Sequence, residues 1–199
     1  MEGFWDFMRL LPLSEAELAD IGAHVEVKRF KPNQVLLSPG NTCTHAYFVL
    51  KGGFVCRYFN DNLETPKTIN FYLNDLHPFM ACVDSYFFQQ PSACELRAIA
   101  DSEVVCMSKK QIDRLIERYP TLKSFYENVV IQALVEENEL KLKIISHSAD
   151  QLYQYLIAEL PEVIQKVPSK YIAEFMGISA EWLSKVKKKK SATARNRIS

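Results

Sequence analysis

The sequence predicts an α+β fold: an N-terminal double-stranded β-helix, or jelly-roll barrel, then one long helix, then an all-α C-terminal unit. Short apolar strands separated by turn residues about every ten positions occupy residues 25–107, which is typical of small antiparallel barrels. Apolar residues then recur at helical spacing from residue 120 to about residue 145. Two short helical patterns joined by a glycine follow within residues 167–190. We therefore expect domains at residues 1–119, 120–147 and 148–199.

The first 25 residues predict two short helices. Ser14 followed three residues later by Glu17 is a capping-box signature, and Leu18 and Ile21 add an apolar edge. The segment lacks the basic region and long apolar core of a secretory signal. The chain has no apolar run of about 18 residues, the length that a membrane-spanning helix needs. We expect a cytoplasmic protein that does not bind membranes.

Alternating and apolar runs predict the strands of the barrel. Turns are indicated by Lys31-Pro32-Asn33, by Ser38 to Asn41 and by Lys51-Gly52-Gly53. A short helix is expected at residues 84–90, and a further helix after Ser108 that stops at Pro120. The expected strands are residues 25–30, 34–37, 45–50, 54–59, 66–72, 94–99 and 103–107.

The cysteines and histidines do not form a recognisable metal or catalytic motif. No two of the five cysteines have CxxC spacing, so we expect reduced thiols that pack as small apolar groups. A metal enzyme with a barrel of this kind needs several histidines converging on one ion. His45 stands alone on its strand, and no Ser-His-Asp, phosphate-loop or paired-carboxylate pattern has a supporting fold signal. We therefore expect no enzyme, no catalytic residue and no metal site. The cysteines are Cys43, Cys56, Cys82, Cys94 and Cys106.

The long helix carries one apolar stripe, which Glu137 interrupts. An isolated helix of this length would leave an apolar face in water, so we interpret the stripe as the seam of a homodimer. Packing of the same stripe against the chain's own barrel is the alternative. The stripe comprises Leu122, Tyr126, Val129, Ala133, Leu140 and Ile144.

Residues 167–190 predict a helix-turn-helix. Pro168 suits a helix start, and a small residue, Ala173, stands where two steeply crossing helices would touch. Gly177 stands where the first helix would end in a left-handed conformation. Ser179 can cap the second helix. The apolar residues that would hold the pair together are Ile172, Met176, Ile178, Leu183 and Val186.

The outer face of the second helix is then free to enter a DNA major groove. From Ser169 onward the chain has eight basic and two acidic residues, although the whole chain carries no net charge. A basic end on an acidic body is expected when one small module meets phosphates. Trp182 lies on the same face, where it would either stack on the DNA backbone or pack against helix 148–159. The candidate DNA-binding residues are Ser169, Ser179, Ala180, Glu181, Ser184, Lys185, Lys188 and Lys189.

This order of barrel, long helix and helix-turn-helix resembles the cyclic-AMP receptor protein/FNR (Crp/Fnr) family of transcription regulators. The resemblance covers nearly the whole chain and rests on Pro39-Gly40, residues 47–52, residues 98–107 and residues 172–190. It implies a homodimer that reads an inverted-repeat site in double-stranded DNA, with RNA polymerase as a further partner. It also implies that a cyclic nucleotide-binding-like barrel senses a small ligand. The places that match the family's base-reading residues hold Ala180, Glu181 and Lys185.

The ligand site departs from the family's pattern. The family's Gly-Glu pair, which holds the ribose, is absent from residues 75–80, and its phosphate-binding Arg is absent from residues 90–94. Arg97 matches a later strand position, and Glu136 and Glu137 would repel a phosphodiester. We therefore expect no cyclic-nucleotide cofactor and either another ligand or none. The candidate pocket residues are Phe79, Met80, Ser92, Ala93, Arg97 and Glu136.

One alternative function keeps the barrel and the dimer helix. In that reading the chain is a ligand-sensing module whose helical tail binds a protein, and it has no salt-dependent affinity for DNA. The lysine-rich second helix of the pair favours the DNA-binding reading.

Overall fold

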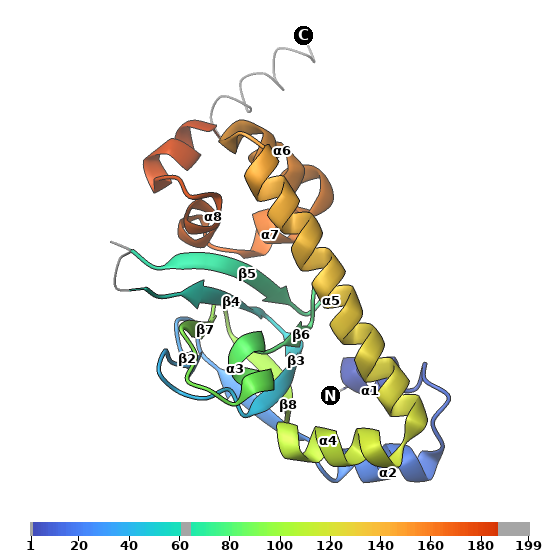
Figure 1. Cartoon of the computed structure of the whole chain (residues 1–199). Coiled ribbons are helices and arrows are strands. Elements are labelled where there is room, and N and C mark those ends of the chain that lie inside the picture. The colour runs from blue at the N-terminus through green and yellow to red at the C-terminus, as the bar shows by residue number, and fades with distance from the viewer. Residues whose placement is uncertain (1, 61–64, 187–199) are drawn as a thin grey trace.

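The computed structural model describes residues 2–60 and 65–186 (Figure 1). Two helices open the chain, α1 (Glu2–Met8) and α2 (Glu15–Gly22). The predicted capping box is confirmed, because the Ser14 hydroxyl accepts from the Glu17 backbone N–H and the Glu17 carboxylate accepts from the Ser14 backbone N–H. Leu18 and Ile21 are buried, so this helix is held by packing as well as by its cap.

The barrel consists of two four-stranded antiparallel sheets, ordered β1-β8-β3-β6 and β2-β7-β4-β5. This confirms the predicted α+β class with a jelly-roll barrel followed by C-terminal helices. The strands are β1 (Glu26–Phe30), β2 (Val35–Leu37), β3 (His45–Lys51), β4 (Gly53–Tyr58), β5 (Lys67–Leu73), β6 (Phe79–Met80), β7 (Cys94–Ala98) and β8 (Ser102–Ser108).

One strand and one turn illustrate how local sequence shapes the barrel. Strand β6 was not expected from the sequence, because two residues are too few to show a period. It pairs with β3 at Tyr47 and Phe48. Gly52 has a φ of 74° in the β3–β4 turn, where an added Cβ would lie 2.6 Å from the Asp101 carbonyl oxygen. That turn therefore requires glycine. Helix α3 (Val83–Phe88) follows β6 and overlaps the expected range 84–90, beginning one residue earlier and ending two residues earlier.

Within the described residues, six helical segments follow the barrel. Helix α4 (Lys109–Arg118) has a complete capping box formed by Ser108 and Gln111. Helix α5 (Pro120–Ser146) is the predicted long helix and runs along one side of the molecule (Figure 1). It is followed by α6 (Ala149–Glu159), α7 (Pro161–Lys166) and α8 (Ser169–Met176), and residues 180–186 are again helical. The short helix α7 was not predicted, although Pro161 at its first turn is a helix-start signal. The domain boundaries at residues 119/120 and 147/148 stay a prediction.

The C-terminal helices pack on the outer face of the β2-β7-β4-β5 sheet. Helix α8 lies beside β5 (Figure 1), where the Phe71 and Phe175 rings are 4.9 Å apart between centroids. Val55 and Leu73, also from this sheet, are fully buried in the same apolar cluster. An apolar outer face on a barrel sheet must be covered, and here the helical unit covers it. Within the described residues, no helix is both long and apolar enough to cross a membrane.

Candidate nucleic-acid interface

The turn between α8 and the next helix is built from local hydrogen bonds. Gly177 has φ 66° and ψ 28°, the left-handed conformation that glycine adopts without strain. The Ile178 N–H donates to the Ala173 carbonyl at 3.0 Å, and the Gly177 N–H donates to the Glu174 carbonyl at 3.3 Å. This pair of bonds is a Schellman turn, which ends α8.

The second helix of the pair starts at a serine cap. The Ser179 hydroxyl accepts from the Trp182 backbone N–H at 3.1 Å. Leu183 and Val186 are buried, as are Ile172 and Ala173 of α8. The burial predicted for these four residues is confirmed, and it comes from the spacing of apolar residues that the helix-turn-helix pattern requires.

The opposite face of this second helix is exposed to solvent. Trp182 also lies on this face, with 41% of its surface exposed. Its stacking on the DNA backbone and its packing against helix α6 both stay predictions. Ser169 is exposed at the first turn of α8. The exposed residues of the second helix are Ser179, Ala180, Glu181, Trp182, Ser184 and Lys185. Lys188 and Lys189 lie outside the described residues, and the role of all these candidates in DNA binding stays a prediction.

Glu181 lies in the first turn of this helix, where local hydrogen bonds favour the charged form of its carboxyl group. Hydrogen bonds from its own backbone N–H and from the Ser179 hydroxyl, together with the nearby Lys185 charge, lower the pKa of its carboxyl group. The carboxylate is therefore ionised at neutral pH and can accept hydrogen bonds. Lys185 stands one turn further along, so the exposed face offers an acceptor and a cationic donor side by side.

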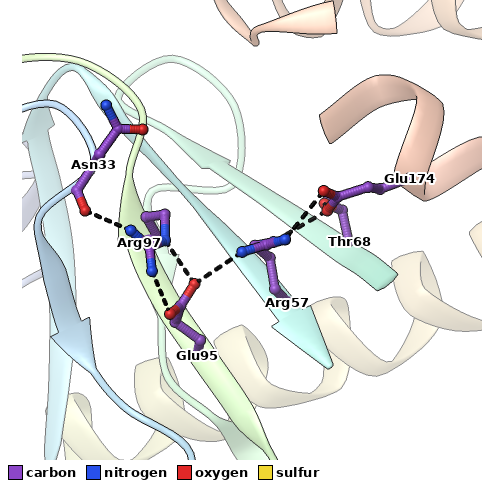
Figure 2. A network of polar contacts seen from close by, with 6 residues as sticks. All are labelled: Asn33, Arg57, Thr68, Glu95, Arg97 and Glu174. Carbon is purple, nitrogen blue, oxygen red and sulfur yellow. Dashed lines mark hydrogen bonds and ion pairs between the residues drawn. The ribbon is translucent and has the colours of Figure 1, made fainter. Parts of the chain in front are cut away.

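A partly buried polar network attaches α8 to the barrel (Figure 2). The Glu174 carboxylate accepts from Arg57 Nε and Nη2, each at 3.0 Å, and from the Thr68 hydroxyl at 2.8 Å. Arg57 also donates to Glu95 at 3.3 Å, and Glu95 in turn accepts two hydrogen bonds from Arg97 at 2.7 and 2.6 Å. These bonds raise the pKa of Arg97. The alternating charges neutralise one another, so the network fixes the helix pair on the barrel at a defined position.

Sequence reasoning missed this network because its members are far apart in the chain. Arg57 and Glu174 are separated by 117 positions, and no periodicity relates residues at that distance. The alternation along β4 was the one available signal. Phe54 and Cys56 face the barrel interior, so Val55 and Arg57 must face outward, toward whatever covers the sheet.

The structure does not bring the six candidate pocket residues together. Met80 lies in the barrel interior, whereas its neighbour Phe79 packs on the other side of the strand against Phe7 and Phe125. Arg97 belongs to the outer network and also donates to the Asn33 carbonyl at 2.7 Å. The remaining three, Ser92, Ala93 and Glu136, each contact different parts of the chain.

Ser92 and Ala93 lie beside the barrel interior, and Glu136 lies outside it. The Ser92 hydroxyl accepts from the Cys94 N–H at 2.9 Å, and the Ala93 carbonyl accepts from the Phe59 N–H at 2.9 Å. Glu136 pairs with His77 at 2.9 Å on the surface of α5. The predicted residues therefore do not line one cavity, and the pocket stays a prediction.

Thiols and aromatic rings fill the interior of the barrel. All five cysteines are buried and free, and each belongs to the same apolar cluster inside the two sheets. Burial raises the pKa of the Cys43 and Cys106 thiols. Among the described residues, the fully buried polar side chains include no lysine or arginine. Nor do three or more His, Cys, Asp or Glu side chains in this part of the chain lie where they could hold a metal ion.

Helix α5 has two apolar faces, and the predicted dimer seam lies on the one that meets its own chain. Leu122 is buried against α1 and α2, and Leu140 is half-buried against the C-terminal helices. Glu137 on the same side accepts a hydrogen bond from Asn70 of β5. At Leu122 and Leu140, the stripe therefore packs on its own chain, which is the alternative to the dimer seam. Of the other predicted seam residues, Ala133 and Ile144 are exposed, and Tyr126 and Val129 are half-buried.

Comparisons with known proteins agree with this architecture. Residues 27–119 match the family model described as Cyclic nucleotide-binding domain, and no curated protein sequence matches the chain. Among solved structures, the c-di-GMP-responsive global regulator CLP of Xanthomonas campestris is 14% identical, with 91% of this chain and 93% of that chain covered at a TM-score of 0.68. FixK2 from Bradyrhizobium japonicum is 10% identical, with coverage of 85% and 86% and a TM-score of 0.71.

A third solved structure carries the family description itself. It is a protein from Eubacterium rectale described as a transcriptional regulator of the Crp/Fnr family, 13% identical over 91% of this chain and 85% of that chain, with a TM-score of 0.66. At these identities the likeness shows the fold. The resemblance to Crp/Fnr proteins predicted from the sequence is confirmed at that level, across the barrel, the long helix and the C-terminal unit.

Proposed function

We propose that this chain, which has a cyclic nucleotide-binding domain and the Crp/Fnr fold, is a sequence-specific DNA-binding transcription regulator. The observation that carries the proposal is the exposed face of helix 180–186. The helix is anchored from behind by buried Leu183 and Val186, and it presents polar and charged side chains outward. A rigid helix with one free polar face fits the B-DNA major groove, which is about 12 Å wide.

The chemistry of that face suits base reading. The Glu181 carboxylate can accept a hydrogen bond from a cytosine amino group, and the Lys185 ammonium can donate to guanine O6 or N7. Ser179 and Ser184 can donate to phosphate oxygens, and Ser169 can do so from the start of α8. Lysine lacks the planar fork of arginine, so its base readout is less geometrically restricted.

The regulator acts as a homodimer on an inverted repeat. Helix α5 keeps a second, exposed apolar face that a partner helix would cover. Two recognition helices related by a two-fold axis meet successive major grooves about 34 Å apart. RNA polymerase is the further partner that this role implies, and the cytoplasm is the compartment that holds both partners.

The barrel senses a ligand other than a cyclic nucleotide, or none. A cyclic phosphate needs a cation within hydrogen-bond reach, and the nearby arginine, Arg97, is engaged by Glu95 on the outer face of the sheet. The interior is occupied by thiols and aromatic rings instead. These contacts support a regulator whose barrel does not respond to cyclic AMP.

The competing proposal is a sensor module whose helical tail binds a protein, with no catalytic activity in either case. Both proposals use the barrel and α5, and they differ in what the exposed face of helix 180–186 contacts. Binding to DNA through lysines weakens steeply as salt rises, because counterions are released from the phosphates. Salt dependence together with sequence preference therefore separates the two proposals.

The test compares two lysine variants on a DNA site enriched from genomic fragments by the full-length protein. Lys185→Ala should weaken binding to that site by about 1–3 kcal/mol, since it removes one base contact. Lys110→Ala, an exposed lysine on α4, carries the same change of charge away from the helix pair and should leave affinity unchanged. Equal binding by the Lys185→Ala variant and the parent protein would exclude this role for Lys185.

A further inference from the structure

Three of the five buried thiols meet at one point inside the barrel. Cys56 lies on β4, Cys94 begins β7, and Cys82 is the N-cap residue of α3. The Cys94 sulfur accepts hydrogen bonds from the thiols of both Cys56 and Cys82, and Cys56 also donates to Cys82. Three separate elements therefore bring three sulfur atoms within hydrogen-bond reach of one another. DNA binding by helix 180–186 makes no use of them.

Cys94 is the most reactive thiol of the three. The hydrogen bonds that Cys56 and Cys82 donate stabilise the Cys94 thiolate and lower its pKa, against the opposing effect of burial. Donation of its proton to Cys82 and Cys94, together with burial, raises the pKa of Cys56. Cys94 is also the most accessible of the three, with 8% of its surface exposed against 3% for Cys56 and 1% for Cys82. Because the thiolate is the nucleophile, a small oxidant that enters the barrel reacts first with Cys94.

Cys82 is the partner that can close a disulfide with Cys94. Cys56 and Cys94 lie on adjacent strands but not opposite each other, since Cys56 pairs with Leu96 and Cys94 pairs with Tyr58. Such diagonal neighbours are about 7–8 Å apart, whereas the Cα atoms of a disulfide are usually about 4.4–6.8 Å apart. Cys82 stands between β6 and α3, outside the strand ladders, so its backbone is free to approach Cys94.

We propose that Cys82 and Cys94 form a reversible disulfide when hydrogen peroxide reaches the barrel interior, and that this bond loosens the attachment of the helix pair. The Cys94 thiolate attacks one peroxide oxygen and becomes a sulfenic acid, while the other oxygen leaves as hydroxide and is protonated to water. The Cys82 sulfur then attacks the sulfenic sulfur, and the S–S bond forms as the hydroxyl leaves with the Cys82 proton as a second water. Two thiols and one peroxide thus give one disulfide and two waters, and a dithiol reductant restores the thiols.

The disulfide would act on the helix pair through the next residue of β7. Glu95 follows Cys94 and, by strand alternation, points to the outer face of the sheet, where it accepts from Arg57 at 3.3 Å (Figure 2). Arg57 in turn donates to the Glu174 carboxylate of α8. Because the Arg57–Glu95 bond is already long, a small shift of Cys94 toward α3 is enough to break it. The disulfide stands by itself, and only its effect on DNA binding rests on the proposed function.

The disulfide is tested on the reduced full-length protein, which is treated with hydrogen peroxide, alkylated in urea and mapped by mass spectrometry. A Cys82–Cys94 cross-link should form in the parent protein and disappear after treatment with dithiothreitol. Cys94→Ala should not form it. Cys106→Ala removes a thiol of the same interior that contacts Lys28 instead, and this variant should form the cross-link as the parent does. Peroxide that leaves all five thiols of the parent free, or that joins a different pair, would overturn the proposal.

The effect on the helix pair is tested by hydrogen exchange of the α8 amides, which needs no DNA. Exchange should become faster on oxidation in the parent and in Cys106→Ala, and should stay unchanged in Cys94→Ala. Equal rates in the oxidised and reduced parent would overturn the link between the disulfide and the helix pair. On the repeat selected by the reduced protein, oxidation should also weaken binding several-fold. A reduced protein that selects no DNA, although its α8 exchange responds to oxidation, would overturn the DNA-binding proposal alone.

Discussion

Replacing Glu174 by glutamine tests how the helix pair is held on the barrel. The change keeps the size of the side chain and removes its charge. Glu174 accepts three hydrogen bonds, two from Arg57 and one from Thr68. With glutamine in its place, Arg57 keeps a single carboxylate partner, Glu95, which already bonds twice to Arg97. The partly buried cluster then carries an uncompensated positive charge.

The expected cost follows from the exposure of the pair. Removing one partner of a fully buried ion pair costs about 3–5 kcal/mol. The Arg57 and Glu174 side chains are 15% and 21% exposed, so water and Glu95 compensate part of that loss. We therefore expect Glu174→Gln to lower the free energy of unfolding by about 2–3 kcal/mol.

The measurement is urea unfolding of both proteins at one fixed protein concentration, since a dimer's stability depends on concentration. Glu159→Gln on α6 is the matched control, because Glu159 is exposed and such changes usually stay within about 0.5 kcal/mol. A loss in Glu174→Gln no larger than the loss in Glu159→Gln would refute the reasoning that this network anchors α8.

Three further predictions concern the turn, the barrel thiols and the pH dependence. Gly177→Ala should lower stability by about 1–2 kcal/mol in the same assay, because its φ of 66° strains any L side chain although the added methyl meets no atom within 4 Å; an unchanged midpoint would contradict this. The five buried cysteines should react with a thiol reagent slowly in the native protein and completely in urea, and fast native labelling would show that the barrel is open. Partial burial raises the pKa of Glu137 above 4.5, so the folded state holds this proton more tightly than the unfolded state and stability falls as pH rises above 4.5. Glu137→Gln should therefore be more stable than the parent at pH 7 but not at pH 4. A variant that is less stable than the parent at pH 7 would contradict a raised pKa for Glu137.

Local patterns in the sequence were sufficient to predict most helices and strands, including the two helices of the helix-turn-helix. Ser14 with Glu17, Gly177 and the spacing of Leu183 and Val186 each specify a conformation through neighbours in the chain. Such signals act within one or two turns of helix and can be read without knowing the fold. Strand β6 and helix α7 could not be predicted in this way because both are too short to show a hydrophobic period.

Properties that depend on long-range packing could not be read from the sequence. The apolar stripe through Leu122 and Leu140 was a correct observation, but only the position of the barrel decides that this face of α5 is covered by its own chain. The second stripe, through Ile131 and Ile145, became visible once the first was occupied. The placement of Arg97 on the outer face of the sheet likewise depends on which residues face inward along β7.

The most direct test of the DNA-binding claim is selection of genomic DNA fragments by the purified full-length protein, with no ligand added. We expect recovery of a common inverted repeat whose half-site centres are about 10 base pairs apart, one helical turn. We also expect binding to this repeat to weaken as salt rises. An intact dimer that enriches no fragment would contradict the claim that the exposed face of helix 180–186, as the structure presents it, reads DNA.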